Sequence, residues 1–403
     1  MNEETRRFIK ENRQADIRRL ALKSAPSEVD LPLALTQIEG WQKLRHKVPV
    51  WANTPGILYP RQLSLEQCSS EQTALYKQQL IARLLPHTDD RQRMIDLTGG
   101  MGVDFSWASR LFKLGIYVER DAQLCQLARH NFAQLGLQGV EVINGDGSEL
   151  IGQRGPFDLI YLDPARRNKA GRKTVSIADC EPDATALSNL LLANGKRIVI
   201  KLSPMLDCRL ALNELPCVSE LHVVACEGEC KELLAVMQPG FTGETAIFCT
   251  NDAERFRFTY TEETASDCSF ATCPERYLYE PNAALLKAGA FRLPGARFNL
   301  KKISANSHLY TSTELCPAFP GRTFHIEAYS GFGKKELRVL LKDTVKANLT
   351  VRNFPATVAE LRKKMKLAEG GDIYLFATTG PKAEKWLIRC NKIHSPSCST
   401  VQP

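Results

Sequence analysis

The sequence predicts an α/β protein built on a doubly wound parallel sheet, with an N-terminal helical segment and a C-terminal α+β module. Apolar strands alternate with helical stretches from Met94 onward, which is typical of a parallel sheet covered by helices on both faces. The stretch from Asp96 to Asp104 places three glycines between a strand and a helix. Beyond about residue 270 the chain becomes basic and rich in turns, which indicates a separate module.

Residues 1–65 are expected to be an N-terminal helical region. Phe8, Ile17 and Leu20 recur among charged residues at near-helical intervals, and a second apolar stretch runs over 33–44. Prolines then interrupt the pattern. A further helix should begin near Ser70 and end at Leu85, directly before a proline.

Residues 66–265 are expected to form the domain with the parallel sheet. The predicted strands are 94–97, 116–119, 140–144, 159–162, 197–201 and 221–225. The predicted helices between them are 105–114, 122–135, 183–192 and 203–215. Alternating residues at 245–249 and 255–260 indicate an antiparallel pair that closes the sheet or begins the next module.

The glycine turn predicts a site for a nucleotide-like ligand. Glycines lack the side chains that would block the approach of a ligand, and the following helix N-terminus offers free N–H groups. The third glycine of the dinucleotide fingerprint is replaced by Val103-Asp104, which favours another adenosine-containing cofactor over NAD. The candidate cofactor-binding residues of this stretch are Asp96, Thr98, Gly99, Gly100, Gly102 and Asp104.

Three acidic residues follow the second, third and fourth predicted strands, at a spacing that would let them contact the same ligand. Glu119 ends the second strand, where an acid accepts hydrogen bonds from ribose hydroxyls. Asp146 follows the third strand, on the side expected for adenine. The fourth strand delivers Asp163-Pro164 to the carboxyl edge of the sheet, where open α/β sheets bind ligands.

The net charge of +8 is unevenly distributed along the chain. Residues 271–403 hold 21 Lys and Arg against 10 Asp and Glu, whereas residues 1–270 hold 32 against 35. A basic tail suits a polyanionic partner such as nucleic acid, although a solvated basic face or a protein contact would have the same composition. The candidate RNA contacts in this tail are Arg352, Arg362, Lys363 and Lys366.

The composition is that of a globular protein that stays in the cytoplasm. No apolar run approaches the length of a membrane span, and the charged N-terminus lacks the apolar core of a signal peptide. The 13 cysteines lack the regular spacing of a disulfide framework. Cys226 and Cys230 are the closest pair, but they do not form a CxxC motif. No metal is therefore expected.

The series Asp96…Gly100-Met-Gly102, Glu119, Asp146, Asp163-Pro164 resembles class I S-adenosylmethionine-dependent methyltransferases. It is most similar to the branch that methylates nitrogen atoms of nucleic-acid bases, and the whole chain resembles bacterial methyltransferases with a THUMP-like C-terminal domain. The resemblance implies a small ferredoxin-like connecting module over 266–322 and a THUMP-like domain over 323–403. It further implies S-adenosyl-L-methionine as cofactor, ribosomal or transfer RNA as substrate, and Asp163 and Pro164 as the residues that orient the acceptor amine.

One position departs from the family pattern. The family reads Asp-Pro-Pro followed by an aromatic residue, whereas this chain reads Asp163-Pro-Ala-Arg166. Stacking on a base would have to come from elsewhere, and Tyr161 and Phe157 are more typical of core residues. A similar pattern occurs in methylases of pyrimidine carbon, which need a nucleophilic cysteine; the candidates are Cys180, Cys208 and Cys226.

Basic residues follow the Asp-Pro motif directly. Arg166 and Arg167 lead a run that would grip phosphates or form a solvated loop. Lys201 ends the next strand and would either contact a substrate phosphate or pair with Asp163. Two other functions stay open: an RNA-binding protein on a methyltransferase-like scaffold with little activity, and a small-molecule methyltransferase.

Overall fold

A computed structural model describes residues 1–22, 26–60, 62–166 and 176–393. The chain forms two compact units, one from Met1–Glu220 with Leu233–Gly243 and the other from Leu221–Glu232 with the chain from Glu244 onward.

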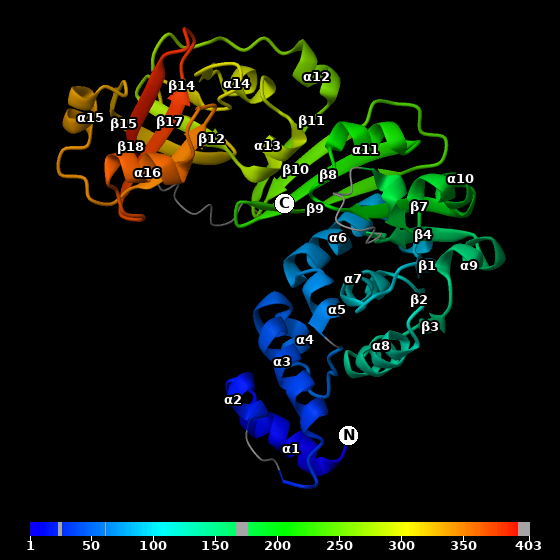
Figure 1. Cartoon of the computed structure of the whole chain (residues 1–403). Coiled ribbons are helices and arrows are strands. Elements are labelled where there is room, and N and C mark those ends of the chain that lie inside the picture. Colours follow the sequence, from blue (N-terminus) through cyan, green and yellow to red (C-terminus); the bar gives the residue numbers. More distant parts are fainter. Residues whose placement is uncertain (23–25, 61, 167–175, 394–403) are drawn as a thin grey trace. The chain divides into compact units, whose positions relative to one another are not determined.

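The larger sheet has the strand order β11-β10-β8-β9-β7-β4-β1-β2-β3 (Figure 1). Its strands are β1 (Arg93–Asp96), β2 (Leu114–Glu119), β3 (Val140–Asn144), β4 (Phe157–Leu162), β7 (Gly195–Leu202), β8 (Val218–Cys226), β9 (Glu229–Met237), β10 (Ala246–Asn251) and β11 (Glu254–Phe258). The five strands from β3 to β7 pair in parallel, which confirms the predicted doubly wound sheet. The strand order reverses between β1 and β4, and this switch point is where such sheets bind ligands.

The end of the sheet differs from the prediction in one element. β10 and β11 pair antiparallel, as expected. β9 was not predicted from the sequence; it runs antiparallel beside β7, where Val199 pairs with Val236 and Ile200 with Ala235.

Helices form the N-terminal region and alternate with the parallel strands, as predicted. They are α1 (Glu3–Asn12), α2 (Ile17–Ala21), α3 (Leu31–Lys47), α4 (Pro49–Asn53), α5 (Gln62–Gln67), α6 (Glu71–Leu84), α7 (Val103–Ala108), α8 (Ala122–Gln134), α9 (Gly147–Arg154), α10 (Ala184–Asn194) and α11 (Cys208–Glu214). The N-terminal helices bury Ile9, Leu20, Ala34 and Ile38 against one another. α6 begins where predicted because the Ser70 side chain accepts a hydrogen bond from the Thr73 N–H.

Two helices are shorter than predicted. The helix expected over 105–114 ends at Ala108 and continues only as a 3-10 turn, because Lys113 and Leu114 already donate backbone hydrogen bonds to the chain ahead of β1. The helix expected over 203–215 begins at Cys208, because Asp207 caps it by accepting a hydrogen bond from the Leu210 N–H.

The second unit contains a seven-stranded sheet of order β13-β14-β12-β15-β18-β17-β16. Its strands are β12 (Tyr277–Pro281), β13 (Lys301–Lys302), β14 (Tyr310–Ser312), β15 (Gly321–Ser330), β16 (Asn348–Arg352), β17 (Ile373–Thr379) and β18 (Lys385–Ile393). Its helices are α12 (Tyr260–Ala265), α13 (Ala283–Ala288), α14 (Leu293–Arg297), α15 (Lys334–Leu340) and α16 (Val358–Met365). β12 pairs with β15, so the regions expected as 266–322 and 323–403 share one sheet.

None of the helices in the described ranges combines the length and the apolar character that crossing a lipid bilayer requires.

Candidate functional site

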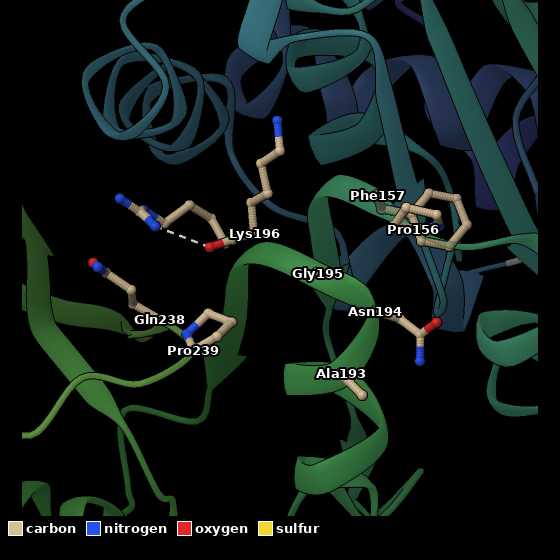
Figure 2. Close-up of a pocket in the computed structure, with 9 residues that line it drawn as sticks. Pro156, Phe157, Ala193, Asn194, Gly195, Lys196, Gln238 and Pro239 are labelled. Atoms are coloured by element: carbon tan, nitrogen blue, oxygen red, sulfur yellow. Dashed lines mark hydrogen bonds between the residues drawn. The ribbon is translucent and has the colours of Figure 1, made fainter.

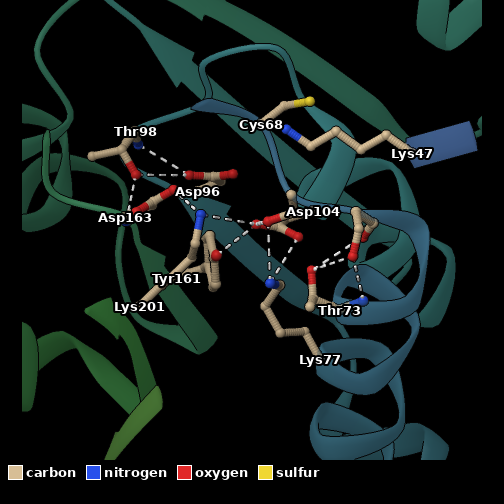
Figure 3. A network of polar contacts seen from close by, with 12 residues as sticks. Lys47, Cys68, Thr73, Lys77, Asp96, Thr98, Asp104, Tyr161, Asp163 and Lys201 are labelled. Atoms are coloured by element: carbon tan, nitrogen blue, oxygen red, sulfur yellow. Dashed lines mark hydrogen bonds and ion pairs between the residues drawn. The ribbon is translucent and has the colours of Figure 1, made fainter. Parts of the chain in front are cut away.

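Polar side chains meet at the switch point of the parallel sheet (Figure 3). Asp96 ends β1 and Asp163 lies just beyond β4, and pairing of these adjacent strands places both at the same edge. Thr98 joins them: its N–H donates to Asp96 Oδ1 (3.0 Å), and its hydroxyl accepts from the Asp163 N–H (2.7 Å). The glycine loop and the Asp-Pro motif are thus connected by hydrogen bonds.

Asp104 lies in a buried network of hydrogen bonds and ion pairs and not on the surface of the glycine loop. Its Oδ2 accepts hydrogen bonds from the hydroxyls of Ser69 (2.7 Å) and Tyr161 (2.8 Å). Lys77 lies 3.1 Å from Oδ1, and Lys201 lies 4.0 Å from Oδ2. Burial by itself would raise the pKa of Asp104, but the two lysine cations hold this pKa below its ordinary value.

Lys77 is a member of the network that the sequence interpretation missed. It lies on the buried stripe of α6 and is 1% exposed. The sequence contains the signal: Lys77 lies four positions after the buried Thr73 and three after the buried Ala74, so it falls on the apolar face of the helix.

Asp96 has a buried carboxyl group with a raised pKa. Burial raises its pKa to about 8, the charges of Asp104 and Asp163 act in the same direction, and hydrogen bonds from Thr98 oppose them. Asp96 therefore carries a proton through much of the neutral range, which leaves two lysines facing two carboxylates in the network.

The glycines of the loop serve two different purposes. A Cβ at Gly99 would lie 2.2 Å from the Tyr117 ring, and one at Gly102, where φ is +82°, would lie 2.7 Å from the Phe132 ring. Both glycines are thus required by packing beneath the loop. A Cβ at Gly100 would meet only the Thr98 carbonyl oxygen at 3.7 Å, so the space beside this glycine is open enough for a ligand to approach the backbone.

Glu119 and Asp146 lie at the ends of β2 and β3, as their spacing predicts. Glu119 Oε2 accepts the Gly100 N–H (2.8 Å), which places the carboxylate beside the open part of the loop. Asp146 caps α9 and also contacts Arg120 Nη2 at 2.6 Å. The hydrogen bond from the Ser148 hydroxyl, together with Arg120, lowers the pKa of Asp146.

Arg120 was not singled out from the sequence. Its guanidinium also pairs with Glu181 (2.5 Å) in β6 (Cys180–Glu181), which pairs antiparallel with β5 (Ala165–Arg166). The acid after β3 is therefore linked through Arg120 to the short ribbon that follows the Asp-Pro motif. Arg166 belongs to β5, whereas Arg167, also predicted as a substrate contact, lies outside the described residues.

The aromatic and cysteine candidates near the motif are core residues. Tyr161 and Phe157 are buried, and the Tyr161 hydroxyl is bonded to Asp104. Cys180, Cys208 and Cys226 are also buried. Burial raises the pKa of Cys226 to about 11, which is unfavourable for a nucleophilic thiolate.

Lys201 pairs with Asp163, which is one of the two arrangements that the sequence predicted. Its ammonium lies 2.6 Å from Asp163 Oδ2, and its side chain is only 14% exposed. Pro164 is buried.

The predicted basic residues of the tail divide into two groups. Arg352 is tied to the buried Glu280 through a 2.8 Å hydrogen bond, and Arg362 donates to the Ala347 carbonyl at 3.2 Å. Lys363 and Lys366 are exposed at the end of α16. Two of the four predicted contacts are thus engaged within the protein, and two face solvent.

The described residues also line an open cavity of about 390 Å³ (Figure 2). Phe157 and Gly195, at the amino ends of β4 and β7, line it together with Gln238 and Pro239. Asp163 follows the opposite end of β4, so the cavity lies at the edge of the sheet remote from the switch point.

The residues at the switch point fit an adenosine-containing cofactor. Gly100 leaves its backbone open to close approach, and Glu119 presents a carboxylate next to it as ribose hydroxyls require. The parallel sheet with this loop defines a class I S-adenosylmethionine-dependent methyltransferase. When bound, S-adenosyl-L-methionine supplies a methyl group on a sulfonium.

Comparison with known proteins agrees with this class. Family models match residues 57–169 as Protein-L-isoaspartate(D-aspartate) O-methyltransferase, 277–320 as a ferredoxin-like domain and 321–392 as THUMP domain-like. A protein of Porphyromonas gingivalis W83, assigned as a methyltransferase, has a crystal structure similar to this one with a TM-score of 0.84. It is 38% identical, and the match covers 96% of this chain and 97% of that chain. The chain belongs to the family of this protein, the S-adenosylmethionine-dependent methyltransferases with a THUMP-like C-terminal domain.

Two further relatives are more distant. An uncharacterized S-adenosylmethionine-dependent methyltransferase of Mycobacterium tuberculosis is 23% identical over 309 residues, which is 75% of this chain and 80% of the relative. A Protein-L-isoaspartate O-methyltransferase of Nitrobacter winogradskyi is 31% identical over 113 residues, 28% of this chain and 51% of that protein.

Proposed function

We propose that the protein methylates a base nitrogen in ribosomal or transfer RNA, which it would meet in the cytoplasm. The observation that carries the proposal is the position of Asp163: it lies at the switch point, next to the cofactor loop, with a side chain that is 37% exposed. A carboxylate there accepts a hydrogen bond from an amine and orients it toward the methyl group. The Pro164 carbonyl is proposed as a second acceptor for the amine.

A basic surface on the second unit supports an RNA substrate. The exposed basic residues of α15, α16 and the turns after them are Lys334, Lys335, Arg338, Lys342, Lys346, Lys363, Lys364 and Lys366. Glu336 and Glu360 accept hydrogen bonds from the backbone N–H groups of Gly333 and Thr357 at the helix starts, and Asp343 and Glu369 are exposed acids in the turns that follow the helices. We call the eight basic residues the basic helical surface, and exposed lysines and arginines of this kind suit a sugar–phosphate backbone.

A methyl-transfer assay tests the proposal. RNA from a strain that lacks the gene is incubated with labelled cofactor and either wild-type protein or Asp163→Ala. The wild type should label the RNA, and Asp163→Ala should lose at least about 100-fold in rate while binding cofactor normally. Absence of label from every RNA pool contradicts the enzymatic role on RNA and favours an RNA-binding protein with little activity.

A protein carboxyl group is the second candidate substrate. The match of residues 57–169 to the isoaspartate methyltransferase model favours it. This match ends soon after the Asp-Pro motif and does not include the basic helical surface, so it reflects the cofactor-binding part of the chain. An isoaspartyl peptide in the same assay separates the candidates, and a small-molecule methyltransferase should label neither.

A further inference from the structure

We propose that Lys201 is a positioning residue for methyl transfer: it holds one oxygen of Asp163 so that the other oxygen faces an acceptor nitrogen that carries a hydrogen. This inference rests on the proposed function and adds to it the residue that positions Asp163 toward the acceptor nitrogen.

Asp163 is fixed at two points. Its backbone N–H donates to the Thr98 hydroxyl (2.7 Å), and its Oδ2 contacts the Lys201 ammonium (2.6 Å). Within the part of the chain that the structure describes, Oδ1 of Asp163 receives no hydrogen bond. Because an ionised carboxylate accepts hydrogen bonds and donates none, the remaining oxygen selects a partner with an N–H or O–H group.

Lys201 is itself held in place. Its side chain is 14% exposed, and its ammonium lies 4.0 Å from Asp104 Oδ2 on the side away from Asp163. Asp104 is anchored in turn by Ser69, Tyr161 and Lys77 (Figure 3). A lysine enclosed in this way keeps a constant geometry, which a solvated lysine on a flexible stem would not.

The surroundings favour nitrogen over pyrimidine carbon as the acceptor. Methylation of such a carbon needs a cysteine nucleophile, and Cys180, Cys208 and Cys226 are each no more than 6% exposed. Cys68 lies near the network in Figure 3, but burial raises the pKa of its thiol, which disfavours the thiolate. An N–H acceptor needs only alignment and a base for its proton, and Asp163 provides both.

The step balances in atoms and charge. The nitrogen lone pair forms the new C–N bond, and the electron pair of the breaking C–S bond stays on sulfur, which becomes a neutral thioether. Asp163 Oδ1 takes up the proton that the methylated nitrogen releases and passes it to water. Lys201 compensates the negative charge of Asp163 before it takes up this proton and again once the proton has passed to water.

The test compares variants of the full-length protein with the RNA pool of a strain lacking the gene. Lys201→Met removes the charge and Lys201→Arg retains it. Lys196→Met is the matched control, because Lys196 also lies in β7 and pairs with a carboxylate, Asp158 at 2.7 Å, but at the opposite end of the strand. Cofactor affinity is measured by calorimetry, kcat and KM by label transfer, and the methylated nucleosides by mass spectrometry.

Lys201→Met should lower kcat by roughly 100-fold while KM for the cofactor and its affinity stay within about threefold, because misplacing a positioning group affects the reacting geometry. Lys201→Arg should restore part of the rate, and Lys196→Met should match the wild type. If Lys201 acts through Asp163, the double variant Lys201→Met with Asp163→Asn should be no slower than Asp163→Asn alone. This double variant also leaves no unpaired charge, so it remains informative if Lys201→Met is unstable.

A kcat for Lys201→Met within twofold of the wild type would overturn the role of Lys201 and leave the RNA proposal intact. A carbon-methylated nucleoside would overturn both the nitrogen acceptor and that part of the proposed function, while leaving RNA as the substrate. Methylation of the isoaspartyl peptide and not of RNA would overturn the proposed function as a whole.

Discussion

The Gly100 backbone N–H donates a hydrogen bond to Glu119 Oε2 at a distance of 2.8 Å. The other oxygen of Glu119 accepts from the Asp121 N–H at 2.9 Å. The acid that ends β2 therefore holds the open part of the glycine loop and the start of α8 at the same time. A single carboxylate thus shapes the edge where the cofactor is expected to bind.

Glu119→Gln should weaken cofactor binding by about tenfold or more, because hydrogen bonds to a charged acceptor contribute about 1.5–3 kcal/mol each. Glu141→Gln is the control: Glu141 lies on the neighbouring β3 and contacts Arg154 at 3.1 Å, away from the loop. Calorimetric titration with S-adenosyl-L-methionine measures the effect. Equal affinities of the two variants would show that Glu119 has no part in binding the cofactor.

Gly102→Ala should destabilise the protein more than Gly136→Ala. Both glycines have positive φ, +82° and +67°, but a Cβ at Gly102 would lie 2.7 Å from Phe132, whereas one at Gly136 would meet nothing within 4 Å. Strain alone should cost about 1–2 kcal/mol at either position, and overpacking should add about 1–3 kcal/mol at Gly102. Urea unfolding of the two variants measures the difference, and equal losses would contradict the packing role assigned to Gly102.

Asp96→Asn should change how stability depends on pH. The pKa of Asp96 is about 8 in the folded protein, against an ordinary value of 3.8. Between these values the unfolded chain is ionised at this position while the folded chain keeps its proton, so the contribution of Asp96 to stability falls as the pH rises from about 4 to about 8.

Asparagine does not titrate and still accepts the hydrogen bonds from Thr98. The free energy of unfolding of Asp96→Asn relative to the wild type should therefore rise with pH in this window, by at most about 1.4 kcal/mol per pH unit. Urea unfolding at several pH values from 4 to 9 measures it. Parallel stability curves for the two proteins would mean that Asp96 is ionised when folded.

Arg352 and the exposed lysines of α16 should respond differently to mutation. Arg352 and Arg322 both contact Glu280, which is 3% exposed, so Arg352→Ala leaves a buried carboxylate with one cation fewer and should lower the melting temperature. Lys363→Glu combined with Lys366→Glu should instead weaken RNA binding and reduce its dependence on salt, with little change in melting temperature. Thermal unfolding and RNA binding at several salt concentrations distinguish the two. If Arg352→Ala lost RNA affinity while its stability stayed unchanged, Arg352 would be an RNA contact and not a structural residue.

The sequence by itself determined the parallel sheet, because strands buried on both faces leave continuous apolar runs and the caps of the intervening helices are local signals. It also predicted that Glu119, Asp146 and Asp163 lie at one edge of the sheet, since the carboxyl ends of parallel strands meet there. β9 was not predicted although its residues from Leu233 to Met237 are all buried, because a short continuous apolar run does not by itself distinguish a buried strand from a segment of buried helix.

Only the tertiary structure decided which polar residues are engaged within the protein. Ser69, Asp104 and Lys201 come from widely separated parts of the chain, and no pattern in the sequence predicts that folding brings them together. The same holds for Arg352, whose partner Glu280 lies 72 positions earlier. Local spacing indicates where a side chain emerges from a strand or helix, whereas the partner that meets it depends on how distant elements pack.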